Sequence, residues 1–118
     1  MDIEELRKYC MNKPGVNEGF PFDEDTLVFK IKDKMFCLTN LNCPSSINLK
    51  CEPERAIELR EEYEEILPGF HMNKKHWNSV SLEGRLSNTL LQELIDDSYL
   101  LAANNLTKKE RNSLNFDN

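Results

Sequence analysis

The chain has 118 residues, 39% of them hydrophobic and 31% charged, with a formal net charge of −6. This is the length and composition of one folded domain, and it argues against a disordered chain and against a protein whose whole surface attracts nucleic acid. No apolar run approaches the roughly 20 residues that cross a bilayer, and the acidic amino-terminal residues lack the apolar segment of a secretion signal. We therefore expect a cytoplasmic protein that does not bind membranes.

A helix is predicted at the start of the chain. Asp2, with Glu5 three residues later, is an N-cap signal, and an apolar stripe at helical spacing follows. Pro14 and Gly15 end the helix, because proline cannot continue one and glycine turns the chain. The sequence thus predicts a helix over residues 2–12.

Two phenylalanines around a proline come next, at residues 20–22, and three adjacent acids follow at residues 23–25. We expect the aromatic segment to plug one edge of the core and the acids to form a solvated turn. A divalent-cation site at the acids is the alternative, but alternating carboxylates chelate better than adjacent ones.

Three strands of a meander are predicted at residues 26–32, 35–39 and 46–50, where apolar and polar side chains alternate. The first two would form a hairpin with a tight turn at Asp33-Lys34. One face of each strand would pack on the core. The open face would carry three lysines, Lys30, Lys32 and Lys50.

A second helix is predicted over residues 53–66, because Pro53 suits the first helical position. Seven of the 21 acids lie between Glu52 and Glu65, which indicates a solvated acidic face. A short strand at 70–72, a loop at 73–76 and a strand at 77–82 come next.

The carboxyl-terminal part predicts a long helix over residues 88–104, capped by Ser87, and a further turn or two that begins with the capping box of Thr107 and Glu110. We expect one domain over residues 1–114 and a frayed tail at 115–118.

Residues 68–82 differ most from the rest of the chain. They contain the only tryptophan, both histidines and an adjacent lysine pair, and no acid lies between Glu65 and Glu83. Strand alternation would point Asn78 inward together with Val80. A buried amide needs partners, so either Asn78 holds the loop by hydrogen bonds or the strand begins after it.

The four cysteines show no C-x-x-C spacing, so we expect free thiols and no metal site. A metal shared between Cys43 and Cys51 is the alternative. We expect no other cofactor, because no phosphate-binding glycine loop is present.

These residues resemble the MmcQ/YjbR family of small bacterial proteins over about residues 2–113. The most specific matching segment reads GFHMNKKHWNSV, at residues 69–80. The other matching segments lie at residues 13–16, 20–22, 26–30, 34–36, 47–50 and 53–54. Two departures are Lys32-Asp33, in place of a glycine-rich turn, and a less basic segment at residues 42–46.

The resemblance implies an α+β fold in two layers, an antiparallel five-stranded sheet with helices on one face. The order would be α-β-β-β-α-β-β-α, similar in outline to secretion chaperones and to CyaY. It also implies DNA binding, the usual label of the family. Eight residues of the matching segments would have structural roles: Pro14, Gly15, Phe20, Pro21, Phe22, Gly69, His71 and Asn78.

Three functions compete. A DNA-binding surface would use phosphate contacts from the basic side chains and stacking by Trp77. Its residues would be Lys30, Lys32, Lys50, Asn73, Lys74, Lys75, His76, Trp77 and Arg85. A protein-interaction module, chaperone-like or self-associating, is the alternative. The oligomeric state is not fixed by the sequence, and a monomer is favoured. An enzyme using His71 and His76 is not expected, because no nucleophile, base and orienting group can be assembled.

Overall fold

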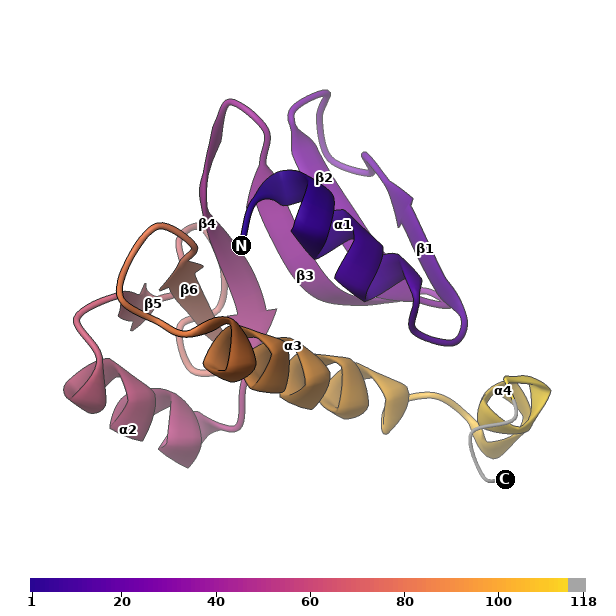
Figure 1. The fold of residues 1–118 in the computed structure, drawn as a ribbon. Helices are drawn as coiled ribbons and strands as arrows, with labels where there is room; N and C mark the ends of the chain where they lie inside the picture. Colours follow the sequence, from indigo (N-terminus) through magenta and orange to yellow (C-terminus); the bar gives the residue numbers. More distant parts are fainter. Residues whose placement is uncertain (115–118) are drawn as a thin grey trace.

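The computed structural model describes residues 1–114, so the tail predicted at 115–118 lies outside the described residues. Figure 1 shows a sheet with helices packed against it. The helices are α1 (Ile3–Met11), α2 (Pro53–Glu62), α3 (Asn88–Ala103) and α4 (Lys108–Ser113). The strands are β1 (Val16–Gly19), β2 (Thr26–Ile31), β3 (Lys34–Asn40), β4 (Cys43–Lys50), β5 (Ile66–Pro68) and β6 (Trp77–Ser81). No helix in this part of the chain is long and apolar enough to cross a membrane.

The strands form one antiparallel sheet in the order β1-β2-β3-β4-β6-β5. The predicted α+β class with an open antiparallel sheet is confirmed, but the sheet has six strands instead of five. The missed strand is β1, whose residues Val-Asn-Glu-Gly show no clear alternation. It is ordered by its neighbour, because Val16 pairs with Ile31 and the Asn17 amide donates to the Lys32 carbonyl oxygen at 3.0 Å.

The β2–β3 turn consists of Lys32 and Asp33, one residue earlier than predicted, because Ile31 pairs with Lys34. Lys32 has φ 55°, the left-handed conformation that costs an ordinary residue about 1 kcal/mol. This is the turn where the family resemblance led us to expect glycine, so the lysine is strained here.

The strand predicted at residues 70–72 is wrong, because the described strand is β5. Helix α2 ends at Glu62, four residues before its predicted end, and Tyr63 is extended. Pro68 fits β5 because β5 is an edge strand, where a missing N–H leaves no neighbour without a hydrogen bond.

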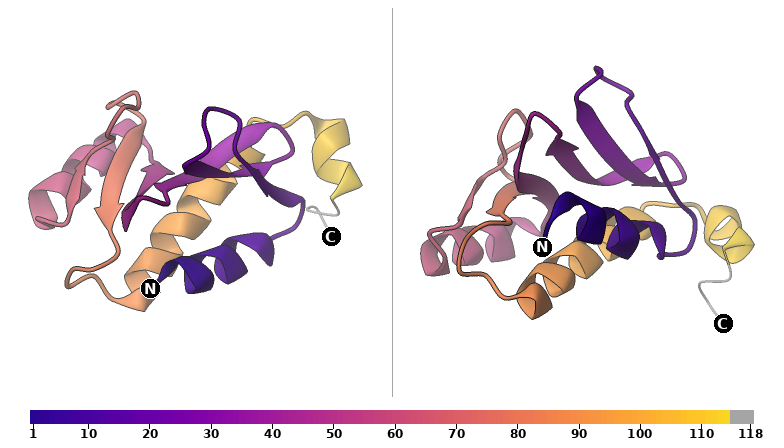
Figure 2. Two further views of the ribbon diagram at one scale, coloured as in Figure 1. Left: turned by 90° about the horizontal axis from the view of Figure 1, so that it is seen from above. Right: turned by 45° about the horizontal axis from the view of Figure 1, so that its top comes forward.

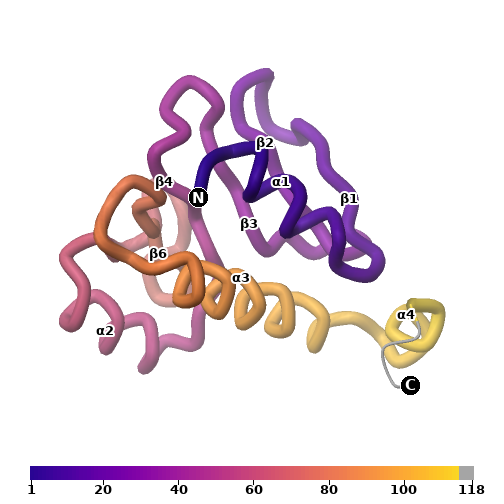
Figure 3. Tube along the Cα trace, viewed as in Figure 1, coloured from indigo at the N-terminus to yellow at the C-terminus, as the bar shows by residue number. Residues whose placement is uncertain are grey.

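The main core lies on one face of the sheet, under α1 and α3 (Figure 2). Phe36 and Tyr99 meet edge to face there, with ring centroids 5.4 Å apart. Helix α2 adds Ala56 and Leu59 to the buried residues at the β5–β6 end of the sheet. Helices α1 and α3 cross the same face of the central strands (Figure 3), and a separate apolar cluster lies on the opposite face.

Candidate functional site: the open face of the sheet

The second face of the sheet carries its own small apolar cluster. Val28, Leu38 and Trp77 are buried in it, and Met35 and Met72 pack against them half-buried. Strand pairing explains this arrangement: residues that alternate with the core residues of β2, β3 and β6 share the opposite face. The face predicted to be lysine-rich is therefore apolar at its centre.

Trp77 is only 6% exposed, so its ring is not offered to a nucleic-acid base, and the predicted stacking role is wrong. Lys50 is its strand partner, and the Lys50 ammonium lies 5.6 Å from the centroid of the indole. Burial, and then the nearby Lys34, lower the pKa of Lys50. Trp77 is thus a buried ring over which the ammonium group of Lys50 lies.

Phe70 is the most exposed aromatic residue of this face, at 69%, yet its backbone is held firmly. Its N–H donates to Ser79 Oγ at 2.9 Å, and its carbonyl oxygen accepts from Asn48 Nδ2 at 3.1 Å. Ser79 Oγ in turn donates to Asn48 Oδ1 at 2.5 Å, which closes a ring of hydrogen bonds across β4 and β6. The backbone that carries this exposed phenyl ring is therefore anchored to β4 and β6.

His71 follows in the left-handed conformation, with φ 59°. Its ring lies against that of Phe70, with centroids 4.1 Å apart and planes inclined by 49°. A non-glycine residue in this conformation persists only where its surroundings hold it, and the anchored Phe70 backbone supplies that support.

The loop from Gly69 to His76 is tied to the sheet and to α2. Lys74 Nζ donates to the Gly69 carbonyl oxygen at 2.9 Å, and Asn73 Oδ1 accepts from the Lys75 N–H at 2.9 Å. A Cβ on Gly69 would lie 2.7 Å from Trp77 Cβ, so this position requires glycine. The loop is thus ordered by its own hydrogen bonds, and Lys75 is exposed in it.

Asn78 is buried and faces α2, as alternation predicted. Its Oδ1 accepts from Arg60 Nε at 2.7 Å, and its amide nitrogen donates to the Ala56 carbonyl oxygen at 3.4 Å. Arg60 also donates to the carbonyl oxygen of Lys74. Of the two alternatives for Asn78, a strand that begins after it is wrong, because β6 begins at Trp77. Its hydrogen bonds go to α2, and Arg60 connects it to the loop.

A hollow of about 500 Å³ lies beside Phe70 on this face. Its apolar lining includes Phe22, Leu38, Phe70 and Met72. Phe22 is 63% exposed, and Phe20 is also exposed, so the prediction that residues 20–22 plug the core is wrong. The physical reason is that Phe22 projects toward this hollow on the open face.

Charge is unevenly distributed around the sheet. Strands β2 to β6 contain no Asp or Glu, whereas they contain Lys30, Lys34 and Lys50. The one carboxylate that lines the hollow is Asp23, which accepts from the N–H groups of Asp25 and Thr26. Those hydrogen bonds lower the pKa of Asp23, so it stays ionised at the end of the hollow.

The structure brings together only part of the predicted nucleic-acid residues. Lys30 is half-buried opposite Met35, near the cluster, whereas Lys32 is exposed in the hairpin turn. His76 is exposed next to Trp77, and its carbonyl oxygen accepts from the Cys51 N–H at 2.8 Å. Arg85 lies beyond the other end of the β5–β6 pair, where its N–H donates to a Glu65 carboxylate oxygen at 3.0 Å.

The remaining residues expected to be structural lie elsewhere. The Pro14 carbonyl oxygen accepts from the Tyr99 hydroxyl at 2.6 Å. Gly15 has φ 74°, and a Cβ there would lie 2.6 Å from a Leu114 methyl carbon. Pro21 is exposed between the two phenylalanines.

Sequence reasoning missed the residues that build the hollow, namely Asn48, Phe70, Met72 and Ser79. A signal was present: Asn48 and Ser79 have the same strand parity as Lys50 and Trp77, which places all of them on one face. Among the described residues, no group of three or more His, Cys, Asp and Glu side chains could hold a metal ion.

Comparisons with known proteins agree with the resemblance found in the sequence. The model of the YjbR family matches residues 11–101. The chain is 35% identical to "Uncharacterized protein YjbR" of Escherichia coli K12 over 115 residues, covering 97% of this chain and 98% of that protein. It is 38% identical to "Uncharacterized protein YbdF" of Escherichia coli O157:H7, covering 92% and 89%.

Two solved structures are similar along most of their length. The crystal structure of Deinococcus radiodurans protein DR2400, described as a DUF419 domain, has a TM-score of 0.90 and 43% identity, covering 97% of this chain and 88% of that one. A Pseudomonas syringae crystal structure has a TM-score of 0.75 and 29% identity, covering 86% and 99%. These similarities support the described fold and name no ligand.

Proposed function

This chain belongs to the YjbR family, and we propose that it binds single-stranded nucleic acid on the open face of its sheet. The proposal is of a binding protein, not an enzyme. One observation carries it: an exposed aromatic ring on an anchored backbone lies beside a hollow, next to strands that contain lysines and no carboxylate.

Phosphates would be contacted by the lysines of this face. The Lys50 ammonium lies over Trp77, Lys30 lies on β2, two strands away from β4, and Lys75 is exposed in the loop that precedes Trp77. Lysine binds phosphate as a point charge and releases counterions when it does so. Asp23 lines the hollow and would repel a phosphate placed beside it, so the phosphates would follow the lysines, away from Asp23.

Bases would meet Phe70 and the hollow. Stacking on an aromatic side chain needs a base whose flat face is free, which a duplex does not offer. Phe70 and Phe22 both line the hollow, and Asn48 and Ser79 line it with side chains whose hydrogen bonds anchor the Phe70 backbone. This combination favours a single strand over a duplex, although the family label refers to DNA in general.

The test is a fluorescence-anisotropy titration with labelled single-stranded DNA, duplex DNA and single-stranded RNA of mixed sequence, at about 50 mM and 200 mM salt. With three phosphate contacts on a single strand, affinity should fall about 20-fold between the two salts. Replacing both Lys30 and Lys75 by Gln should leave about one contact and a slope near −0.7. The matched control replaces the exposed pair Lys108 and Lys109 on α4, and should leave binding unchanged.

Phe70→Ala tests the stacking contact separately. Loss of one stacked base should weaken binding about 5- to 100-fold with no change in the salt slope. The backbone hydrogen bonds of Phe70 do not need its ring, so the fold should be unaffected. No binding of any nucleic acid at the lower salt, or equal loss in the Lys108/Lys109 control, would refute the proposal.

A protein-interaction surface is the second candidate, because several large apolar side chains are exposed. Phe20, Phe22 and Phe70 are exposed near this face, and Leu67 is exposed on edge strand β5. Such side chains are typical of interface centres. Sedimentation velocity of the wild type and of Phe22→Ser would reveal self-association, which we expect to be absent if nucleic acid is the ligand.

A further inference from the structure

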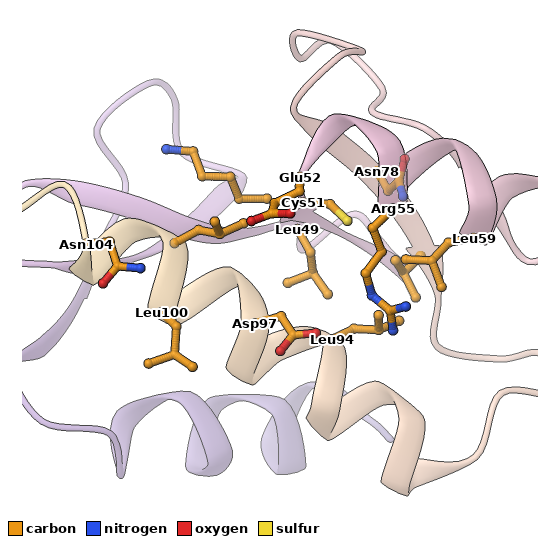
Figure 4. A pocket seen from close by; sticks show the side chains of 13 residues that line it. Leu49, Cys51, Glu52, Arg55, Leu59, Asn78, Leu94, Asp97, Leu100 and Asn104 are labelled. Atoms are coloured by element: carbon orange, nitrogen blue, oxygen red, sulfur yellow. The ribbon is translucent and has the colours of Figure 1, made fainter.

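A second cavity, separate from the open face, lies between α2 and α3. Helix α2 packs mainly on β5 and α3 on β3 and β4, so a cleft of about 320 Å³ remains between them. Figure 4 shows Leu49 of β4, Leu59 of α2 and Leu94 and Leu100 of α3 around it. Pockets of this size hold small molecules.

The cleft is apolar inside and open to solvent. Leu49, Leu59 and Leu94 are buried residues of the main core, whereas Leu100 is 52% exposed although it lines the same space. An apolar ligand that covers Leu100 at the entrance would remove this side chain from water, which is energetically favourable.

Acidic groups outnumber basic ones at the opening. Asp97 and Glu52 line the cleft together with Arg55, and Arg55 Nη2 already lies 3.7 Å from a Glu93 oxygen. In Figure 4 the Arg55 side chain from α2 and the Asp97 carboxylate from α3 lie across the opening from one another.

Lys50 does not change this balance. Lys50 is one of the residues that line the cleft, but its ammonium group lies over Trp77, on the other face of the sheet. Burial raises the pKa of the Asp97 carboxyl, Arg55 opposes this, and the surrounding acids Glu93, Asp96 and Glu52 raise it further. Three acids thus add negative potential at Asp97, and Arg55 opposes them.

We propose that this cleft binds a small organic cation, a primary amine with an apolar body. The body packs against the leucines, and the ammonium lies beside Asp97 at the opening, where it replaces Arg55 as the ion-pair partner of Glu93. Arg55 is free to turn away, because 44% of its side chain is exposed. The site shares Lys50 with the nucleic-acid face, but the Lys50 ammonium lies over Trp77 on the other face of the sheet, so the two proposals can be tested separately.

Three probes of the same shape test the charge requirement: phenethylamine, 2-phenylethanol and phenylacetate. Titration followed by two-dimensional NMR of the amide groups should show phenethylamine binding at about millimolar concentration, with shifts at Asp97 and Leu100. The alcohol should bind several-fold more weakly, and phenylacetate should not bind.

Two substitutions should move the affinity for phenethylamine in opposite directions. Asp97→Asn should weaken it about tenfold, and Arg55→Gln should strengthen it several-fold, because the first removes an attraction and the second a repulsion. Glu54→Gln, an exposed α2 charge that does not line the cleft, is the matched control.

The proposal would be overturned by tighter binding of phenylacetate, by equal binding of the three probes, or by no binding at 10-fold higher concentration than expected. It would also be overturned if Asp97→Asn, shown to be folded by its amide spectrum, bound phenethylamine as the wild type does.

Discussion

Ser98→Ala should destabilise the protein far more than the loss of one oxygen atom suggests. Ser98 lies on α3 with no exposed surface. Its hydroxyl donates to the Phe36 carbonyl oxygen at 2.5 Å and accepts from the Lys50 N–H at 2.8 Å. This one atom therefore joins α3 to both β3 and β4, and alanine would leave a buried donor and a buried acceptor without partners.

The expected cost follows from those two groups. Each buried polar group left without a partner costs about 1–3 kcal/mol, so the free energy of unfolding should fall by about 2–6 kcal/mol. A domain of this length has an unfolding entropy near 0.25 kcal/mol/K, so the Tm should fall by about 8–24 °C.

Urea denaturation followed by circular dichroism would measure the change, with Ser46→Ala on the exposed part of β4 as the control. Hydrogen exchange adds a local measurement, because the Lys50 amide should lose protection in the variant. A loss below about 0.5 kcal/mol, with the Lys50 amide still protected, would refute the reasoning.

Other substitutions and a pH titration test separate features. Gly69→Ala should cost about 2 kcal/mol, because its Cβ would lie 2.7 Å from Trp77 Cβ, and thermal denaturation would measure this. Ser87→Ala should cost about 1 kcal/mol through loss of the α3 N-cap, which accepts from the Leu90 N–H; Asn88→Ala is its control. The pKa of Tyr9 and of Tyr99 is raised to about 12, chiefly by burial. Both tyrosines stay neutral in the folded state while the unfolded chain ionises near pH 10, so stability should be fully present below pH 10 and fall between about pH 10 and 12. Absorbance at 295 nm should show these two groups titrating late, and Tyr9→Phe and Tyr99→Phe should each remove one late step; ionisation of all tyrosines near pH 10 would contradict the assignment.

The helices could be read from the sequence because their signals are local. Ser87 caps α3, and Thr107 with Glu110 forms the predicted capping box of α4. The end of α2 was misplaced because the residues after Glu62 remain compatible with a helix, and it is the pairing of β5 with β6 that ends it.

The candidate site was harder to predict because burial on the open face depends on the partners that strand pairing supplies. Trp77 is covered by Met72, Leu38 and Lys50, which come from three other parts of the chain. The exposed phenylalanines show the converse: Phe22 and Phe70 read as core residues from composition alone. The environment of Asn78 could be predicted from the sequence, because strand alternation points its amide inward and a buried amide requires hydrogen-bond partners.

The two outer strands of the sheet bear on how the protein behaves at high concentration. An unpaired strand edge is a template on which another chain can add, the first step toward fibrous aggregates. Here β5 is three residues long and ends in Pro68, which has no N–H to offer, and β1 is four residues long and ends in Gly19. Both edges are therefore poor templates, so the exposed phenylalanines can stand beside the sheet without also recruiting copies of the chain through their backbones.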